Sequence, residues 1–382
     1  MDTRVKERSR TLEFLTAQGL ALGSAFLVAA IIGSILIVAY DESPLLVFKT
    51  IWVFSTSEPS DIARVLEIAT PLIFSGLAVA VAYKAGMFNI GVEGQYIVGM
   101  SGAAAVALGL DGLPAVVLLP LVLIGAMAAS MFWAAVPAML KVRTGAHEVV
   151  TTIMMNGIAV SFVAYLIRNP LKSPESGLID LRTGEFPTAA LIPGLRSLGL
   201  KDAIPPAVDL TWLFPLGLML CAGLWFFLVR TRLGYEVRAV GSSPGSAEAG
   251  GISIGAAQIK VFLISGAIAG FIGLNHILGD RGYLGSNYET GLGFAGITVA
   301  FLGRNHPAGI PFAAVLLAML SRGQDGIAVT TDLPTEILII LQGVLILAVV
   351  IAYELVNRML VRRRQHEIRS AERTAKPAAA GA

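Results

Sequence analysis

The feature that most constrains this chain is a series of uninterrupted apolar stretches, most about 20 residues long, with charged residues gathered at their ends. A helix needs about 20 apolar residues to cross the hydrocarbon core of a bilayer. The stretches do not alternate in polarity, which favours helices over the strands of a membrane barrel. Only 14% of the residues are charged, against about 25% in a soluble domain. The sequence therefore predicts an all-α, polytopic membrane protein.

The apolar stretches predict about ten transmembrane helices in one transmembrane domain spanning residues 19–354. The first stretch is longer than the core of a signal peptide and has no small-residue cleavage site after it, so we expect it to be retained. The eighth and ninth are short for full crossings, and we leave open that they are pieces of a broken pair. The ten stretches lie near 19–40, 62–83, 90–109, 113–138, 147–167, 210–229, 259–278, 291–303, 308–321 and 333–354.

The placement of basic residues predicts the orientation, because short cytoplasmic loops carry an excess of Lys and Arg. With residues 1–18 as a cytoplasmic N-terminal segment, the basic loops all fall on the cytoplasmic side. An even number of crossings then returns residues 355–382 to the cytoplasm as a basic tail. The basic residues on that side are Lys84, Lys141, Arg143, Arg230, Arg232, Arg238 and Arg304, followed by Arg358, Arg362, Arg363 and Arg364.

Residues 168–209 form a long loop on the expected external side. Six prolines in this loop disfavour regular helix and predict a stiff, irregular lid. Such a lid can contact an external partner or simply cover helix ends. Five crossings before the loop and five after it also suit a 5+5 inverted pseudo-repeat, a common transporter arrangement.

The stretch from Lys84 to Gln95 is a helix-breaking, Gly-rich interruption that carries Asn89, Glu93 and Gln95 beside the bilayer. Polar groups at such a place must be buried in protein or face water. Asn89 and Glu93 share a face if the third helix has already begun there. Glu93 is therefore a functional candidate, with the alternative that it caps or pairs with a helix end.

A second polar stretch, residues 145–156, enters the fifth expected helix. Glu148 falls in the first turn, where a carboxylate favours the helix dipole. Asn156 lies deeper, and an amide there either hydrogen-bonds across helices or lines a path.

Residues 230–258 form a cytoplasmic loop that is too polar to span a membrane. Pro244 follows Ser243 as the first residue of a short helix, and Gly250-Gly251 ends it. A short helix with small side chains can insert into a groove on another protein. The alternative is an ordinary re-entrant loop.

Several kinds of chemistry are not expected. No phosphate-binding G-x-x-x-x-G-K-[ST] motif occurs, so a nucleotide that drives transport must be bound by another subunit. The single cysteine, Cys221, cannot form a disulfide within the chain. The histidines show no ligand spacing, so no metal is expected, and no nucleophile–base pair indicates an enzyme. The four histidines are His147, His276, His306 and His366.

These stretches together resemble the inner-membrane permeases of ABC importers in the ribose and branched-chain amino acid group. The pattern Gly86-x-Phe88-Asn89-Ile-Gly-x-Glu93-Gly-Gln95 is similar to the nucleoside-uptake branch, as is Glu148-Val-Val-x-Thr-x-Met-x-Asn156. Residues 241–252 resemble the coupling helix of the family, with Ser and Gly at positions where the family has Asn and Ala. The coupling residues that the resemblance implies are Gly241, Ser243, Pro244, Ser246, Ala247, Gly250, Gly251 and Ile252.

The resemblance implies a multi-pass inner (plasma) membrane permease with several partners. These are an ABC ATPase subunit that binds ATP-Mg, an external substrate-binding protein, and a second permease, expected to be a different chain. We expect import of nucleosides by alternating access, with ribose or another simple sugar as the alternative cargo. A secondary transporter is disfavoured, because its mid-membrane carboxylate pair or His/Asp relay is not found. The candidates for the path or its gate are Phe88, Asn89, Glu93, Gln95 and Asn156.

Overall fold

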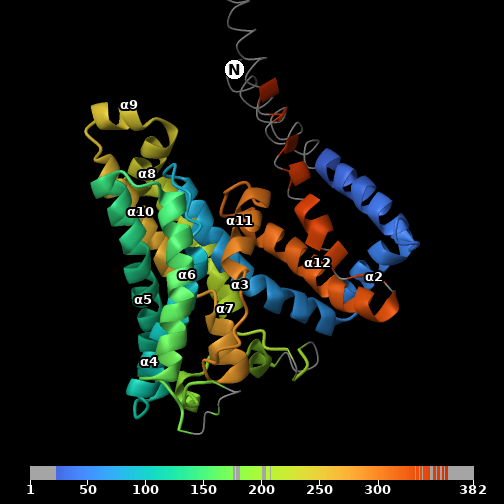
Figure 1. The fold of residues 1–382 in the computed structure, drawn as a ribbon, viewed down its shortest axis with the longest axis horizontal. Coiled ribbons are helices and arrows are strands. Elements are labelled where there is room, and N and C mark those ends of the chain that lie inside the picture. The colour runs from blue at the N-terminus through green and yellow to red at the C-terminus, as the bar shows by residue number, and fades with distance from the viewer. Residues whose placement is uncertain are drawn as a thin grey trace, which may run out of the picture. The chain divides into compact units, whose positions relative to one another are not determined.

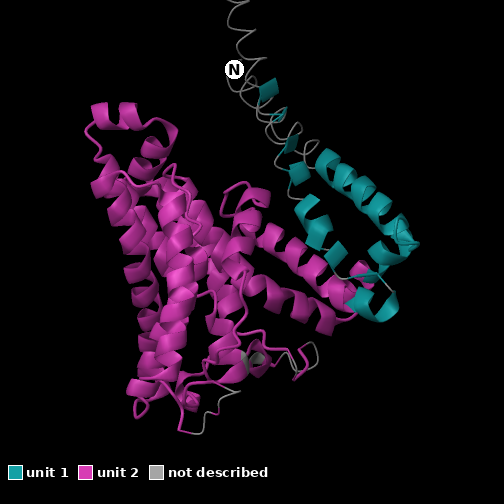
Figure 2. Ribbon diagram, in the orientation of Figure 1, with its two compact units in different colours: residues 1–50, 326–382 teal, residues 51–325 magenta. Residues whose placement is uncertain are grey.

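The computed structural model describes residues 23–174, 177, 181–199, 204–206 and 208–331, and between 333 and 359 all but 335, 338, 345, 346, 350, 353, 354 and 357. The expected segment 1–18 and most of the expected tail 355–382 lie outside the described residues. The chain divides into two compact units (Figure 2), one made of residues 1–50 with 326–382 and one made of residues 51–325. All candidate residues lie in the second unit.

In the described residues the regular structure is helical (Figure 1), with two long connections, one between α6 and α7 and one between α10 and α11 that contains a π-helical turn, η3 (His276–Arg281). Prolines and glycines set many of the boundaries: Pro59 and Pro244 are the first residues of their helices, and Gly145 ends another in a left-handed conformation. The helices are α2 (Pro44–Thr56), α3 (Pro59–Tyr83), α4 (Val92–Gly109), α5 (Ala115–Thr144), α6 (Glu148–Arg168), α7 (Leu213–Arg230), α8 (Arg232–Ser242), α9 (Pro244–Ala249), α10 (Ile254–Ala269), α11 (Leu292–Leu302) and α12 (Ile310–Thr330).

Five of the described helices are long and apolar enough to cross a membrane, namely α3, α5, α6, α7 and α12. Of the two stretches that looked short in the sequence, α12 has 21 residues and α11 only 11. Helix α3 is the central element, with nearly all of its second half buried. Helices α5, α6 and α7 instead expose apolar side chains along one face, including Phe132, Met154 and Phe226.

Helix α11 runs parallel to the second half of α3. The Ser75 hydroxyl donates to the carbonyl of Leu292 at 2.8 Å, and the rings of Tyr83 and Phe301 lie 5.7 Å apart. Helix α11 therefore begins beside the middle of α3 and ends beside its Tyr83 end. Its length of about 16 Å covers half of a hydrocarbon core of about 30 Å. It is a half-helix, preceded by the non-helical residues 282–291.

The connection from α3 to α4 turns back alongside α3. The Ser265 hydroxyl of α10 donates to the carbonyl of Ala78 at 2.6 Å and accepts from Asn89 at 2.8 Å. Asn89 thus lies beside Ala78, more than one helical turn before Tyr83. Because α4 begins only at Val92, Asn89 precedes the helix and does not share a helical face with Glu93.

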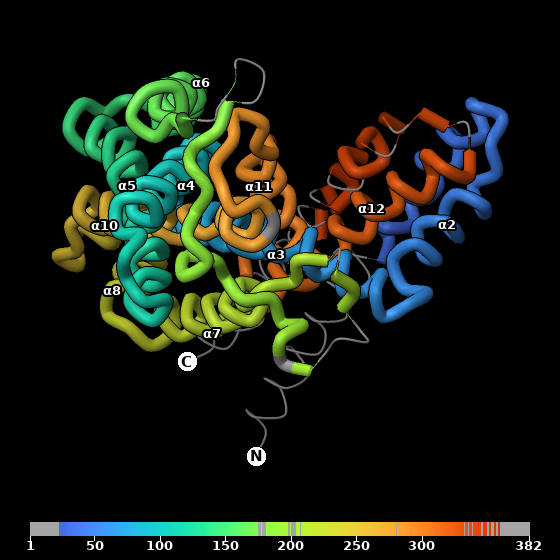
Figure 3. The backbone as a smooth tube through the Cα atoms, turned by 90° about the horizontal axis from the view of Figure 1, so that it is seen from below, coloured from blue at the N-terminus to red at the C-terminus, as the bar shows by residue number. Residues whose placement is uncertain are grey.

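The described part of the long loop between α6 and α7 is irregular, as its prolines predict. Its described residues contain two 3-10 turns, η1 (Thr188–Ala190) and η2 (Leu195–Leu198). The loop pairs with the segment that leads to α11: the N–H of Thr183 donates to Leu284 at 2.9 Å, and the N–H of Ser286 to Leu181 at 2.9 Å. Figure 3 shows the loop in light green beside this orange segment.

In the other unit, an apolar helix covers Gly23–Val38, within the expected first stretch 19–40. Its Gly33 lies directly against the side chain of Leu341, leaving no room for a larger residue.

Candidate functional site

The carboxylate of Glu93 joins the start of α4 to the start of α11. It accepts hydrogen bonds from the backbone N–H groups of Gly291, at 2.7 Å, and Gly293, at 2.8 Å. The Tyr96 hydroxyl lies 3.3 Å from the same carboxylate and donates to the carbonyl of Glu289 at 2.6 Å. Glu93 is only 5% exposed. The first N–H groups of a helix lack partners within it and carry partial positive charge, which is why a buried carboxylate is stable here.

Glycines make this close approach possible. Gly291 has φ of 95°, in the left-handed region that favours glycine. A Cβ on Gly293 would overlap the backbone of Glu93, and a Cβ on Gly296 would overlap Ser75. The start of α11 is therefore held against both α3 and α4 without side chains between them.

Asn89 and Gln95 form a reciprocal amide pair beneath this junction. The Asn89 Nδ2 donates to Gln95 Oε1 at 3.0 Å, and the Gln95 Nε2 donates to Asn89 Oδ1 at 3.1 Å. Asn89 also accepts from the N–H of Gly91 at 3.0 Å and donates to Ser265. Both amides are buried. All hydrogen-bonding groups of Asn89 are thus used in fixing the turn between α3 and α4.

Asn156 of α6 supports the same turn from another side. Its Oδ1 accepts from the N–H of Gly94 at 2.8 Å, and its Nδ2 donates to the carbonyl of Ile90 at 3.0 Å. Ser130 of α5 donates to the carbonyl of Gln95 at 2.7 Å. The structure therefore brings Asn89, Glu93, Gln95 and Asn156 into one buried network.

Phe88 lies apart from this network. Its half-buried ring is 6.1 Å from that of Phe301, which also contacts Tyr83. These three rings form an aromatic cluster at the Tyr83 end of α3, where α11 also ends.

Chemically, the network positions helix starts and leaves few free groups for a ligand. The side chains that the sequence pointed to are saturated by backbone and side-chain partners within the chain. The sequence did not point to Ser130, which bonds Gln95, to Ser265, which bonds Asn89, or to Ser75, which bonds the start of α11. The available signal was an isolated hydroxyl within an apolar stretch, which in a membrane helix needs a partner.

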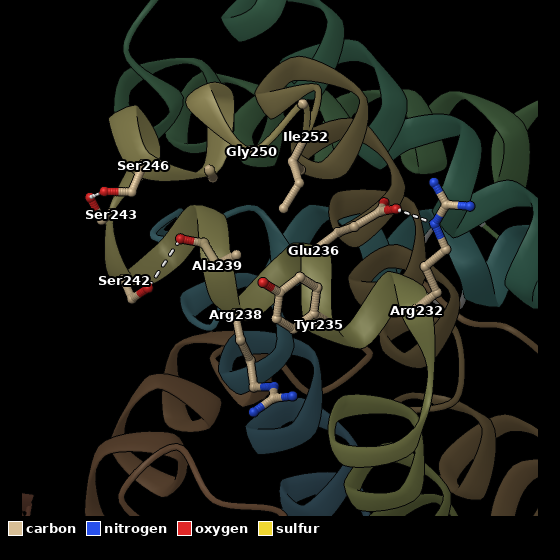
Figure 4. Close-up of a pocket in the computed structure, with 12 residues that line it drawn as sticks. Arg232, Tyr235, Glu236, Arg238, Ala239, Ser242, Ser243, Ser246, Gly250 and Ile252 are labelled. Carbon is tan, nitrogen blue, oxygen red and sulfur yellow. Dashed lines mark hydrogen bonds and ion pairs between the residues drawn. The ribbon is translucent and has the colours of Figure 1, made fainter.

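A cleft of about 680 Å³ lies between α8 and α9 (Figure 4). Helix α9 begins at Pro244, after the extended Ser243, and Gly251 follows it with φ of 81°. Ala247 is 4% exposed and packs against Val240 and Ala257. Of the residues implied by the coupling resemblance, those that line the cleft are Ser243, Ser246, Ala247, Gly250, Gly251 and Ile252.

Gly241, at the end of α8, faces away from the cleft. Its Cα lies against the turn that begins the 84–91 connection, so a Cβ on Gly241 would overlap the carbonyl of Lys84. A Cβ on Gly86 would in turn meet Gly241 at 3.6 Å. Helix α8 thus touches the same connection that Asn89 and Asn156 hold.

Basic side chains from three segments lie near the Tyr83 end of α3: Lys84 after α3, Arg238 in α8 and Arg304 after α11. Burial, followed by the charges of Arg238 and Arg304, lowers the pKa of Lys84. Burial, followed by the charges of Lys84 and Arg304, lowers the pKa of His306. The His306 Nδ1 accepts the N–H of Ala308 at 3.2 Å, which requires that nitrogen to be unprotonated.

A family model described as the permease component of branched-chain amino acid transport systems matches residues 62–350. The chain belongs to this permease family. The permease is 35% identical over 307 residues to the guanosine ABC transporter permease protein NupP of Bacillus subtilis, covering 80% of this chain and 85% of that one. It is 32% identical over 326 residues to a glucose ABC transporter permease protein of Haloferax volcanii, covering 84% of each.

A nucleoside ABC transporter permease protein of Lactococcus lactis, NupB, is 28% identical over 271 residues, covering 71% of this chain and 74% of that one. These findings confirm the family that the motifs at 86–95 and 148–156 indicated. The permease is therefore a multi-pass membrane protein that acts in transport and not as an enzyme.

Proposed function

We propose that this permease is the transmembrane subunit of an ATP-driven importer whose cargo is nucleosides. The observation that carries the proposal is its likeness to a guanosine permease over most of both chains, with a second nucleoside permease among its relatives. The likeness to a glucose permease supports a second candidate cargo, a simple sugar.

The orientation that we propose places the Tyr83 end of α3 in the cytoplasm. Besides burial, Arg238 of α8 and Arg304 lower the pKa of Lys84, and Lys84 and Arg304 lower that of His306, as expected of basic groups from three separate segments at one end of the unit. Contact of Gly241 of α8 with Lys84 agrees with this placement. Positive charge concentrated at one end supports a cytoplasmic location. The loop between α6 and α7 is then external, at the face that an external binding protein would meet.

The element formed by α8 and α9 is our candidate for the contact with an ATPase subunit. The exposed residues of α9 are small apart from Glu248, and the adjoining cleft can receive a protruding side chain. The ATPase subunit would hold ATP-Mg. A second permease, expected to be a different chain, would complete the pair in the inner (plasma) membrane.

Contacts within the chain offer a route for coupling. Gly241 of α8 touches the Lys84–Gly86 turn, the same connection ends in the amide pair of Asn89, and Glu93 follows it directly with its bonds to the start of α11. A displacement of α8 and α9 by the ATPase would therefore reach the start of a half-helix in the middle of the membrane. In this proposal Glu93 and Asn89 act on the gate by holding helix starts, and Phe88 lies at its cytoplasmic end.

Uptake of labelled guanosine and adenosine, measured in cells with and without this gene, tests the cargo. The proposal predicts nucleoside uptake that is lost on deletion and is not competed by excess ribose or glucose. Loss of sugar uptake with unchanged nucleoside uptake would instead establish the second candidate.

A further inference from the structure

The segment that leads to α11 crosses part of the membrane without helical structure. Leu292 lies beside Ser75, which is 16 residues, or about 24 Å, from the Pro59 end of α3. Glu289 lies only three residues before Leu292, and its carbonyl accepts the hydroxyl of Tyr96 in α4. Even a fully extended chain of three residues spans about 10 Å. Glu289 is thus within the depth that α3 crosses.

This segment is polar and exposed at that depth. Ser286, Asn287, Glu289 and Thr290 are exposed and Tyr288 is half-buried. Irregular backbone and an ionisable side chain are tolerated inside a membrane only where they are buried in protein or line a water-filled cavity. Lipid is therefore excluded as the neighbour of these side chains, which leaves a water-filled space or a protein partner such as the second permease.

The backbone of this segment is fixed while the Glu289 carboxylate is not. Tyr96 holds the carbonyl of Glu289 at 2.6 Å, Arg281 holds that of Asn287 at 2.6 Å, and Glu93 holds the N–H of Gly291. Within the described part of the chain, the side chain of Glu289 forms no hydrogen bond or ion pair. A fixed backbone that presents a free carboxylate is suited to binding a polar solute.

One face of α11 continues from this segment toward the proposed cytoplasmic end. Phe294 is 46% exposed, and Thr298 and Phe301 are half-buried at the spacing i, i+4 and i+7. Gly293 and Gly296, in contrast, pack against Glu93 of α4 and Ser75 of α3. The exposed face ends at Phe301, in the aromatic cluster with Tyr83 and Phe88.

We propose that residues 286–290 and the Phe294–Thr298–Phe301 face of α11 line the translocation path, and that Glu289 is its cargo-contacting residue. This contact rests on the nucleoside cargo proposed above. The Glu289 carboxylate accepts hydrogen bonds from two neighbouring donor groups of the nucleoside. These are either the N1–H and 2-amino group of guanine or the 2′- and 3′-hydroxyls of ribose. The ring of Tyr288 lies beside this carboxylate in the chain and offers an aromatic face to the base.

Thiol labelling tests the path independently of the cargo. The sequence contains one cysteine, so Cys221→Ser gives a cysteine-free background. In permeabilised cells that contain the whole transporter, a charged methanethiosulfonate reagent is expected to label Glu289→Cys and Thr298→Cys. Phe132→Cys, on the lipid-exposed face of α5 and 70% exposed, is the matched control and should stay unlabelled. If Glu289→Cys resists the reagent as Phe132→Cys does, the path does not run here.

Uptake by Glu289→Gln tests the contact with cargo. The variant keeps the backbone bond to Tyr96 and should raise the KM for guanosine about tenfold or more, because a hydrogen bond to a charged group is lost. If the guanine edge is bound, adenosine uptake is unchanged; if the ribose is bound, adenosine uptake falls as well, and the wild type transports 2′-deoxyguanosine poorly. Asp111→Asn, in the exposed turn after α4, is the control.

Unchanged guanosine kinetics in Glu289→Gln, with wild-type guanosine uptake intact, would overturn the assignment of Glu289. Absent guanosine uptake in the wild type, with Glu289→Cys still labelled, would remove the nucleoside cargo and leave the path in place.

Discussion

The Oε2 of Glu93 accepts the backbone N–H of Gly293 at 2.8 Å, although the two residues are 200 positions apart in the chain. This bond joins the first turns of α4 and α11. A carboxylate buried among apolar helices is stable only with such partners. The bond therefore makes the position of α11 depend on a side chain of α4.

Removing the Glu93 carboxylate should destabilise the permease. Glu93→Ala leaves the N–H groups of Gly291 and Gly293 buried without acceptors, at a cost of about 2–4 kcal/mol. Glu93→Gln retains one acceptor, so its stability should lie between those of Glu93→Ala and the wild type. Thermal unfolding of each purified protein in detergent measures the difference. Equal unfolding midpoints for all three proteins would show that the bonds of Glu93 to Gly291 and Gly293 contribute nothing to stability.

A methyl group at Gly293 should be poorly tolerated, because its Cβ would overlap the backbone of Glu93. Gly293→Ala is expected to cost about 1–3 kcal/mol through overpacking. Gly157→Ala is the matched control in α6, since nothing lies within 4 Å of its Cβ position and alanine favours helix by up to about 1 kcal/mol. Unfolding midpoints should move in opposite directions for the two variants. A rise for both would contradict the close contact of α11 with α4.

The amides of Asn89 and Gln95 should be energetically coupled. Because each donates to the other, a double-mutant cycle with Asn89→Ala and Gln95→Ala should give a coupling of about 1–2 kcal/mol. Combining Asn89→Ala with Asn169→Ala, an exposed amide after α6, should be additive. Additivity in both cycles would mean that the reciprocal pair is not formed in solution.

The pH dependence of stability should include a contribution from His306. Its pKa is lowered in the folded protein, so the unfolded chain binds the proton more tightly and stability falls as the pH drops below about 6.5. Above that value both states are neutral at this residue and the contribution is constant. His306→Asn should flatten the change in unfolding midpoint between pH 7.5 and pH 5.5. An unchanged slope would show that another group is responsible.

The exposed surface of α9 should be required for the ATPase contact. Ala249 is exposed, so Ala249→Arg adds bulk and charge there without disturbing the packing of α9. We expect normal amounts in the membrane and loss of the ATPase subunit on purification. Asp111→Arg, a matched arginine in the exposed turn between α4 and α5, should retain it. Retention by Ala249→Arg would exclude this surface of α9 from the contact.

The sequence predicted those features that depend on local chemistry. Apolar length indicated the long helices, and Ser243-Pro244 with Gly250-Gly251 indicated both ends of α9. Motifs at 86–95 and 148–156 indicated the family. Each of these signals lies within a few residues of the structure that it specifies.

The partners of the polar residues could not be predicted, because they lie far away in sequence. The choice for Glu93 between capping and lining a path depended on whether another helix started beside it, and Gly291 and Gly293 supply that start. Ala247 illustrates the same limit: its place in the coupling pattern does not reveal that it is buried against Val240 and Ala257. No local pattern points to Glu289, because its significance depends on its depth in the membrane, which follows only from the packing of α11 beside α3.

The most direct test of the proposed importer is to purify the tagged permease from its own membranes and identify the proteins that accompany it. We predict an ATPase subunit and a second permease in stoichiometric amounts, with guanosine uptake into proteoliposomes that requires ATP and a binding protein. A permease that purifies alone and transports guanosine on an ion gradient without ATP would contradict the proposal.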